Sequence, residues 1–200
     1  MPTPVTADTP AESATASVEK QERVWFPETW IWDLLVTGED GEVESNFTSP
    51  DSITDWKATA FCITDIGFGL SPTENLITIK PFFVETYMPY SIVQAEMHTL
   101  KANVFNHLNA CLKIYIQMTS TEDFVSKKTS EDQYFSCLCT GETKTFEWYM
   151  TATKLGLVNV TVSTEALDTS ELCNGQPTVV PENGRINIVT KPLLVKAQNS

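Results

Sequence analysis

The five cysteines are the residues whose chemistry constrains this sequence most, because thiols form disulfides, bind metals or act as nucleophiles. The number is odd, so at least one thiol is free or pairs outside this chain. Cys137 and Cys139 flank one residue, which on an extended segment places both sulfurs on the same side. Such a pair bonds more readily to two other cysteines than to itself, and Cys111 and Cys173 are the candidates. Cys62 stands apart from these four.

A metal site and a reactive thiol are weaker interpretations of the same residues. Structural zinc needs four ligands at finger-like spacing, and the two histidines, His98 and His107, are remote from any suitable cysteine pair. His107 and Cys111 raise the alternative of a thiol–imidazole pair, but a strand-turn-strand segment does not hold that spacing together. We therefore expect no metal, no cofactor and no catalytic residue.

Known catalytic patterns are also missing from the sequence. It has no G-x-S-x-G elbow, H-E-x-x-H zinc helix, glycine-rich phosphate loop or dinucleotide fingerprint. The densest run of carboxylates comprises Glu39, Asp40, Glu42 and Glu44. Nothing in the run indicates convergent acid–base geometry, so it is typical of a solvated acidic loop. The sequence favours a protein that is not an enzyme.

Charge excludes two classes of partner. Thirteen Lys and Arg against 26 Asp and Glu leave a net charge of -13, and the pI is about 4.5. Such a surface repels phosphate backbones and anionic lipid. No segment approaches the roughly 20 uninterrupted apolar residues of a bilayer span. We expect neither a nucleic-acid partner nor a membrane partner.

The compartment follows from the cysteines and from two glycosylation sequons. Asn46-Phe47-Thr48 and Asn159-Val160-Thr161 are acceptors for N-linked glycans in an oxidising compartment. The N-terminus lacks the basic region and apolar core of a signal peptide. We expect a secreted, extracellular protein whose signal peptide lies upstream of this chain.

Short runs of alternating polarity from Trp25 onward predict an all-β architecture. Residues 112–118, 146–150 and 158–162 alternate as half-buried strands do, and the third pattern turns Asn159 outward. Further strands are expected at 30–36, 57–64, 76–84, 99–105 and 186–190. Helical turns are conceivable at 51–56 and 164–172, but they are too short to change the class. The spacing of turn signals is typical of a β-sandwich.

Two stretches near the N-terminus differ from this pattern. Residues 1–24 are rich in Thr, Ser, Pro and Ala without apolar periodicity, which predicts a flexible segment. An aromatic cluster follows, consisting of Trp25, Phe26, Trp30 and Trp32. Alternating aromatics on a strand are more typical of a core than of a ligand box.

Seven blocks of sequence occur in a characteristic order between residues 25 and 195. They are 26–33 (FPETWIWD), 50–58 (PDSITDWKA), 60–62 (AFC), 81–85 (PFFVE), 88–91 (MPYS), 99–102 (TLKA) and 191–195 (KPLLV). In composition and order these blocks resemble the α2-macroglobulin family of protease inhibitors.

The resemblance implies a division of the chain. Residues 25–79 are similar to the closing part of a sixth macroglobulin domain. Residues 80–195 are similar to a complete seventh domain, an antiparallel β-sandwich of the fibronectin or immunoglobulin kind, and 196–200 form a tail. Residues 1–24 stand where the protease-cleaved bait region of the family ends, or they are an alternative leader.

The resemblance also implies roles for single residues. It implies bridges between Cys111 and Cys139 and between Cys137 and Cys173, and a partner for Cys62 upstream of this chain. Asn159 matches a glycosylation position of the family, whereas Asn46 is assigned from its sequon alone. Lys20 and Arg23 would suit trypsin-like enzymes as possible cleavage residues.

In this family a protease cuts the bait, the molecule rearranges and the attacker is enclosed, and a thioester in a Gly-Cys-Gly-Glu-Gln motif can bond it. The chain has no such motif, so the resemblance implies a structural module of an endopeptidase inhibitor directed at serine-type and other proteases. Its expected partners are endopeptidases, through the full-length parent, and the parent's other domains. The alternatives are a complement-like or cell-surface thioester-family module for protein–protein interaction, and a stand-alone adhesive sandwich.

Overall fold

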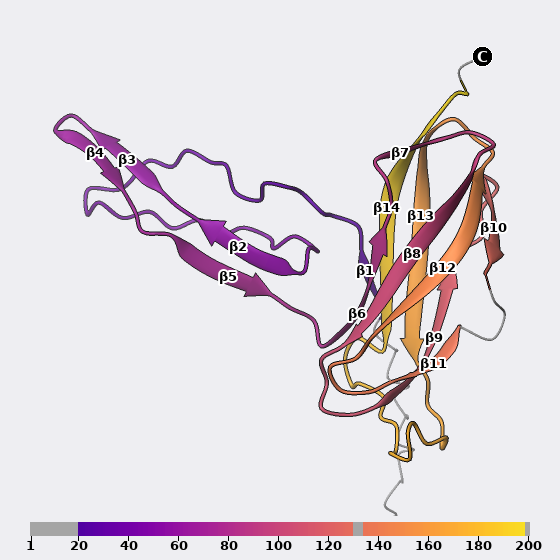
Figure 1. Cartoon of the computed structure of the whole chain (residues 1–200). Helices are drawn as coiled ribbons and strands as arrows, with labels where there is room; N and C mark the ends of the chain where they lie inside the picture. The colour runs from indigo at the N-terminus through magenta and orange to yellow at the C-terminus, as the bar shows by residue number, and fades with distance from the viewer. Residues whose placement is uncertain (1–19, 130–133, 199–200) are drawn as a thin grey trace, which may run out of the picture.

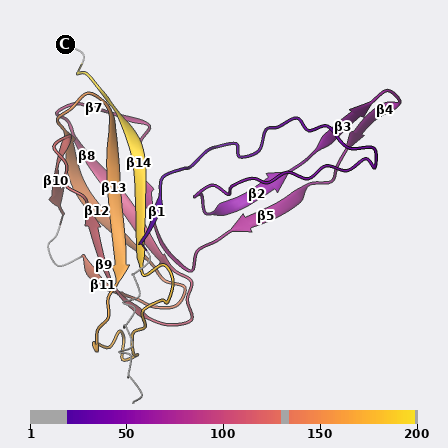
Figure 2. The ribbon, with the colours of Figure 1, turned by 180° about the vertical axis from the view of Figure 1, so that it is seen from behind.

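The computed structural model describes residues 20–129 and 134–198. Within these ranges every regular element is a strand and none is a helix, which confirms the predicted all-β class (Figure 1). Two layers of sheet form a β-sandwich, and an arm of residues 24–81 projects from its side (Figures 1 and 2). Residues 1–19 of the expected flexible segment and 199–200 of the expected tail lie outside the described residues.

One layer is a four-stranded antiparallel sheet in the order β10-β12-β8-β6. Its strands are β10 (Phe124–Lys128), β12 (Thr143–Ala152), β8 (Met97–Asn106) and β6 (Phe82–Tyr87). In β12 the inward side chains include Trp148, which is 2% exposed. The ring of Tyr134 lies 5.3 Å from that of Trp148, and its hydroxyl donates to the carbonyl oxygen of Glu147. The polar tip of this buried aromatic residue is thereby satisfied.

The other layer is a six-stranded sheet whose main path runs β1-β14-β13-β9-β11. Its strands are β1 (Lys20–Arg23), β14 (Ile186–Lys196), β13 (Gly156–Ala166), β9 (Leu112–Met118), β11 (Phe135–Leu138) and β7 (Ser91–Val93), which also pairs with β14. The neighbours β14, β13, β9 and β11 pair antiparallel, whereas β1 and β7 each run parallel to β14.

The core lies between the two sheets and follows the alternation read from the sequence. The apolar positions of 112–118 and 158–162 are buried while the residues between them are exposed or half-buried. Asn159 is exposed, as predicted. These strands are confirmed because each presents one row of branched side chains to the opposite layer.

Two disulfides lie at one end of the six-stranded sheet. Cys111 pairs with Cys139 and Cys137 pairs with Cys173, and these are the pairs that the family resemblance implies. The first joins the residue before β9 to the residue after β11, and the second joins β11 to the loop that follows β13. Cys62 has no disulfide partner within the described residues and is exposed.

The arm differs most from the expectation. Its regular part is two antiparallel pairs: β2 (Thr54–Ala58) with β5 (Glu74–Thr78), and β3 (Phe61–Thr64) with β4 (Gly67–Leu70). Residues 24–53 contain no strand, so the strand expected at 30–36 is wrong. Trp32, expected in a core, is 90% exposed, whereas Phe26 of the same cluster packs against the sandwich core.

Several other expectations need correction. Neither 51–56 nor 164–172 contains a helical turn, because β2 begins within the first and β13 continues into the second. The runs at 57–64 and 76–84 are each interrupted, the second next to Pro81, which has no N–H to donate to a ladder. The stretch 20–23 is a strand, so the expected flexible segment does not extend to residue 24.

Candidate functional site

The described part of the chain contains no group of three or more His, Cys, Asp or Glu side chains that could hold a metal ion. Within the same residues, no helix has the length and apolar character to cross a membrane.

His107, considered from the sequence as a partner of Cys111, lies beside two aromatic rings. The distances between ring centroids are 5.9 Å to Phe83 and 6.4 Å to Phe105. Cys111 is held in its disulfide. Cys111 and His107 therefore form no thiol–imidazole pair, the alternative that the sequence had already disfavoured.

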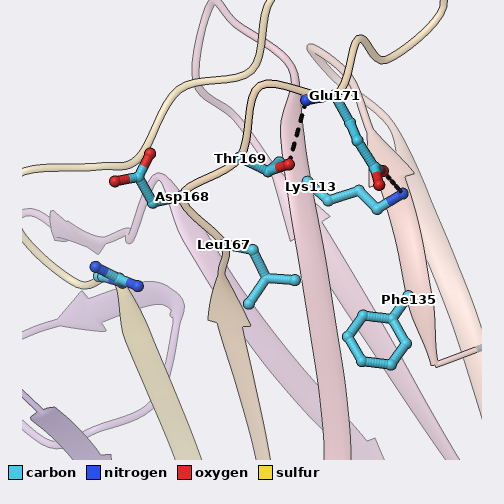
Figure 3. A pocket seen from close by; sticks show the side chains of 7 residues that line it. Lys113, Phe135, Leu167, Asp168, Thr169 and Glu171 are labelled. Carbon is cyan, nitrogen blue, oxygen red and sulfur yellow. Dashed lines mark hydrogen bonds and ion pairs between the residues drawn. The ribbon is translucent and has the colours of Figure 1, made fainter.

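A hollow of about 430 Å³ lies on the outer face of the six-stranded sheet (Figure 3). Its lining consists of Lys113, Phe135, Leu167, Asp168, Thr169, Glu171 and Arg185. Lys113 Nζ lies 2.7 Å from Glu171 Oε2, and Arg185 Nη2 lies 3.0 Å from Glu165 Oε1. Both cations of the hollow are thus already paired with carboxylates, so the hollow offers no unpaired cation that would select an anionic ligand.

A second candidate site is the outer edge of β14, where β1 pairs with it. Residues 20–23 of β1 pair with 186–189 of β14, and residues 91–93 of β7 pair with 194–196. Both must lie on the edge opposite β13, because β13 pairs with β14 throughout 186–195. The short stretch left between them includes Pro192, which carries no amide hydrogen. The edge is therefore closed in two halves.

Arg23 is the residue by which β1 reaches the other sheet. Its side chain is 0% exposed. Nη1 donates to Glu85 Oε1 at 2.8 Å and to the carbonyl oxygen of Asp51 at 3.3 Å, and Nη2 donates to the carbonyl oxygen of Val84. The guanidinium carbon also lies 5.7 Å from the ring centroids of Phe26 and Phe83. A buried guanidinium is tolerated only when it is paired and hydrogen-bonded in this way.

Glu85 receives a second cation from β14. Lys191 Nζ lies 3.3 Å from Glu85 Oε2 and donates to the carbonyl oxygen of Thr86 at 3.3 Å. The same ammonium lies 4.9 Å from the ring centroid of Phe26. One carboxylate therefore holds side chains from both β1 and β14, each of which covers an aromatic face.

These contacts close the free edge of β6. The amide of Val84 donates to Asn187 Oδ1 at 3.1 Å, and its carbonyl accepts from Arg23. The carbonyl of Thr86 accepts from Lys191. Side chains of the opposite sheet thus supply partners that a neighbouring strand would supply elsewhere. We call Arg23, Glu85, Asn187 and Lys191 the seam residues.

Asp51 connects the seam residues to the base of the arm. Its Oδ2 accepts from the amides of Val24 at 3.0 Å and Trp25 at 2.9 Å, and its own amide donates to the carbonyl of Trp25 at 2.9 Å. Because Arg23 also bonds the carbonyl of Asp51, the chain leaving β1 is fixed to the chain entering β2. The site positions three segments: β1, the base of the arm and β6.

The two residues expected as protease cleavage sites, Lys20 and Arg23, both lie in β1. Arg23 is buried and bonded, whereas cleavage by a trypsin-like enzyme requires an exposed arginine, so the folded chain does not offer the expected site. The backbone of Lys20 pairs with Ile186. Glu85, Asn187 and Lys191 were not identified from the sequence. Glu85 could have been noticed, because it is the single carboxylate within the largely apolar strand β6.

The remaining expected sites are accessible. Asn46 and Asn159 are both exposed, and Asn159 lies in β13 opposite Pro192. Cys62 lies in β3 of the arm, opposite Gly69. The other four cysteines pair with one another, so Cys62 is left without a disulfide partner among the described residues.

Comparisons with known proteins agree with this architecture. Residues 29–118 match the alpha-2-macroglobulin family. The chain is 38% identical over 152 residues to ovostatin of Gallus gallus, an alignment that covers 76% of this chain and 10% of that protein. The chain therefore spans about a tenth of the length of this relative.

Two solved structures share the fold at low sequence identity. A trypsin-activated alpha-2-macroglobulin from Escherichia coli has a TM-score of 0.58 at 16% identity, over 80% of this chain and 10% of that one. An Escherichia coli alpha-2-macroglobulin activated by porcine elastase has a TM-score of 0.60 at 15% identity, over 88% and 15%.

Proposed function

Since this chain belongs to the alpha-2-macroglobulin family, we propose that it is a non-catalytic structural module of a secreted endopeptidase inhibitor. In this proposal the parent protein is cut in a bait segment, rearranges and encloses the attacking protease. The module supplies shape and covalent cross-links, and the thioester belongs to another part of the parent.

The observation that carries the proposal is the unpartnered apolar surface of the arm. Its large exposed apolar side chains include Trp32, Leu34, Val36, Ile63, Ile66, Phe68, Leu70 and Ile77. Ile66 is 96% exposed and Trp32 90%. Large exposed apolar surfaces mark interfaces, and two-stranded pairs are marginal without a further layer. In the proposal, residues 25–79 are the closing part of a macroglobulin domain, and other parts of the parent protein supply the rest of that domain.

The proteases named for the two Escherichia coli structures support a protease trigger. One is activated by trypsin and the other by porcine elastase. By analogy, serine-type endopeptidases are the proposed targets of the parent of this chain, and residues 1–19 are proposed as the downstream end of its bait. Cleavage after Lys20 would require β1 to leave β14, because the backbone of that residue is paired.

The covalent sites of the proposal are those expected from the sequence. Cys62 is exposed and is proposed to bond a cysteine upstream in the parent. Asn159 and Asn46 are exposed and are proposed to carry N-linked glycans. Both modifications require the secretory pathway, and the proposed location is extracellular.

The test uses the full-length parent. It is incubated with trypsin, and residual activity is then measured on a large protein substrate and on a small peptide substrate. Entrapment should abolish digestion of the large substrate and leave hydrolysis of the small one, because only the small one diffuses to an enclosed enzyme. If the bait is cut and trypsin still digests the large substrate at its free rate, the inhibitor function is wrong.

A further inference from the structure

β1 has few backbone contacts of its own. Among the described residues it is four residues long and pairs on one side only, with 186–189 of β14. Arg23 adds three hydrogen bonds from one side chain, to Glu85, to Val84 and to Asp51. We propose that Arg23 is a latch: it holds β1 and the base of the arm on the sandwich, and it thereby hides its own peptide bond from trypsin-like proteases.

The latch follows from what such a protease must bind. The arginine side chain has to enter a pocket with a carboxylate at its base, and the backbone around it has to be free and extended. In the folded chain the side chain of Arg23 is 0% exposed and already ion-paired, and its backbone is in register with Val189. Cleavage therefore requires a local opening in which β1 leaves both sheets.

Glu85 controls how often this opening occurs. Arg23 is buried, so the carboxylate that lies 2.8 Å away is needed to stabilise its positive charge. The Nε atom of Arg23 is buried and has no hydrogen-bond partner among the described residues, so these residues provide no further polar contact on that side of the guanidinium. When a neutral side chain replaces Glu85, the guanidinium is better solvated outside the sandwich than within it, and the open state gains population.

Opening also releases the base of the arm. Asp51 accepts from the amides of Val24 and Trp25, the residues that directly follow Arg23. A protease can only engage the Arg23–Val24 bond after these bonds break. The latch therefore couples protease access at one bond to the attachment of the arm, whether or not the parent protein inhibits proteases.

The first test is limited trypsin digestion of the whole chain, with cleavage positions quantified by mass spectrometry. The reference is the Lys154–Leu155 bond, where the side chain of Lys154 is 63% exposed. We expect cleavage after Arg23 to be at least about tenfold slower than at the reference. When opening is fast, cleavage follows the population of the open form, so Glu85→Gln should accelerate it by about tenfold or more.

The matched control is Glu147→Gln. It removes an ion pair of similar length on the same sheet, 2.7 Å to Lys101 against 2.8 Å between Arg23 and Glu85, but one whose side chains are 38% and 55% exposed. This variant should leave the rate at Arg23 unchanged. Equal rates at Arg23 and at the reference in the unaltered chain would overturn the latch, and so would equal rates in Glu85→Gln and Glu147→Gln.

A second variant keeps the proposal testable if Glu85→Gln unfolds the sandwich. Asp51→Asn weakens the latch from the arm side, outside the core. We expect faster cleavage after Arg23 and faster amide exchange at Val24 and Trp25, with unchanged exchange in β13. Unchanged cleavage in this variant would contradict the coupling, and so would a loss of protection that extends through β13.

Discussion

Arg23 and Glu85 are 62 positions apart, and the 2.8 Å ion pair between them joins the strand that precedes the arm to the strand that follows it. The two ends of the arm are thereby fixed at one point of the sandwich edge (Figure 1). Lys191 adds β14 to the same carboxylate. The placement of the arm thus depends on a few polar side chains.

The coupling between Arg23 and Glu85 should be stronger than that of a surface pair. We expect a double-mutant cycle with Arg23→Gln and Glu85→Gln to give an interaction free energy above about 1.5 kcal/mol. The same cycle on Lys101 and Glu147, whose side chains are 55% and 38% exposed, should give about 0.2–1 kcal/mol. Urea denaturation of the four single and two double variants measures both. Equal values for the two cycles would show that burial adds nothing.

Each disulfide should stabilise the sandwich by a similar amount. The bridges Cys111–Cys139 and Cys137–Cys173 span 28 and 36 residues. Restriction of the unfolded chain by loops of this length is worth about 2–4 kcal/mol each. Replacing either pair by serines should lower the free energy of unfolding by that amount in guanidinium denaturation. A loss confined to one pair would mean that the other closes a loop already ordered in the unfolded chain.

Shortening a side chain of β9 should lower the free energy of unfolding only where that side chain faces the core. Ile114 is 0% exposed between the sheets, so Ile114→Ala should reduce the free energy of unfolding by about 2–5 kcal/mol. Gln117 lies on the same strand and is exposed, so Gln117→Ala should change it by no more than about 0.5 kcal/mol. Thermal denaturation compares the two. Similar losses would mean that the outer face is covered as well.

The glycans should be separable by single substitutions. Expression through a secretory pathway should add mass at Asn159 and at Asn46, because both are exposed. Asn159→Gln and Asn46→Gln should each remove one glycan, seen by mass spectrometry before and after enzymatic deglycosylation. No change in mass for one of them would show that its sequon is unused.

The arm should drive self-association of the isolated chain. Ile66 is 96% exposed at the turn between β3 and β4, so Ile66→Lys should reduce association in sedimentation velocity without changing sandwich stability. The control Thr99→Lys adds the same charge to an exposed position of β8. Equal effects of the two substitutions would indicate that net charge, and not the apolar arm, controls association.

The sequence correctly predicted the strands whose alternating polarity is matched by a second sheet to pack against. Residues 112–118 and 158–162 alternate and also have a second sheet to pack on, so period and structure coincide. Residues 30–36 alternate too, but no described strand of this chain pairs with them, and they form none. Periodicity states which face a strand would bury, and it carries no information on whether a neighbour is present.

The burial of Arg23 could not be predicted for a different reason. Four residues at the end of a Thr-, Ser- and Pro-rich segment have no apolar pattern. Their position is decided by partners far along the chain, Glu85 on one sheet and residues 186–189 of β14 on the other. The disulfide pairing was implied by a family resemblance, since the cysteine spacing alone left it open.

Because β1 and β7 occupy separate halves of β14, with Pro192 between them, the two halves are independent of one another. Detaching β1 would expose four residues of the backbone edge of β14, 186–189, together with the Val84 carbonyl of β6. A strand from another molecule could then pair with only four residues of β14. Release of β1 therefore does not expose an edge long enough to start polymerisation.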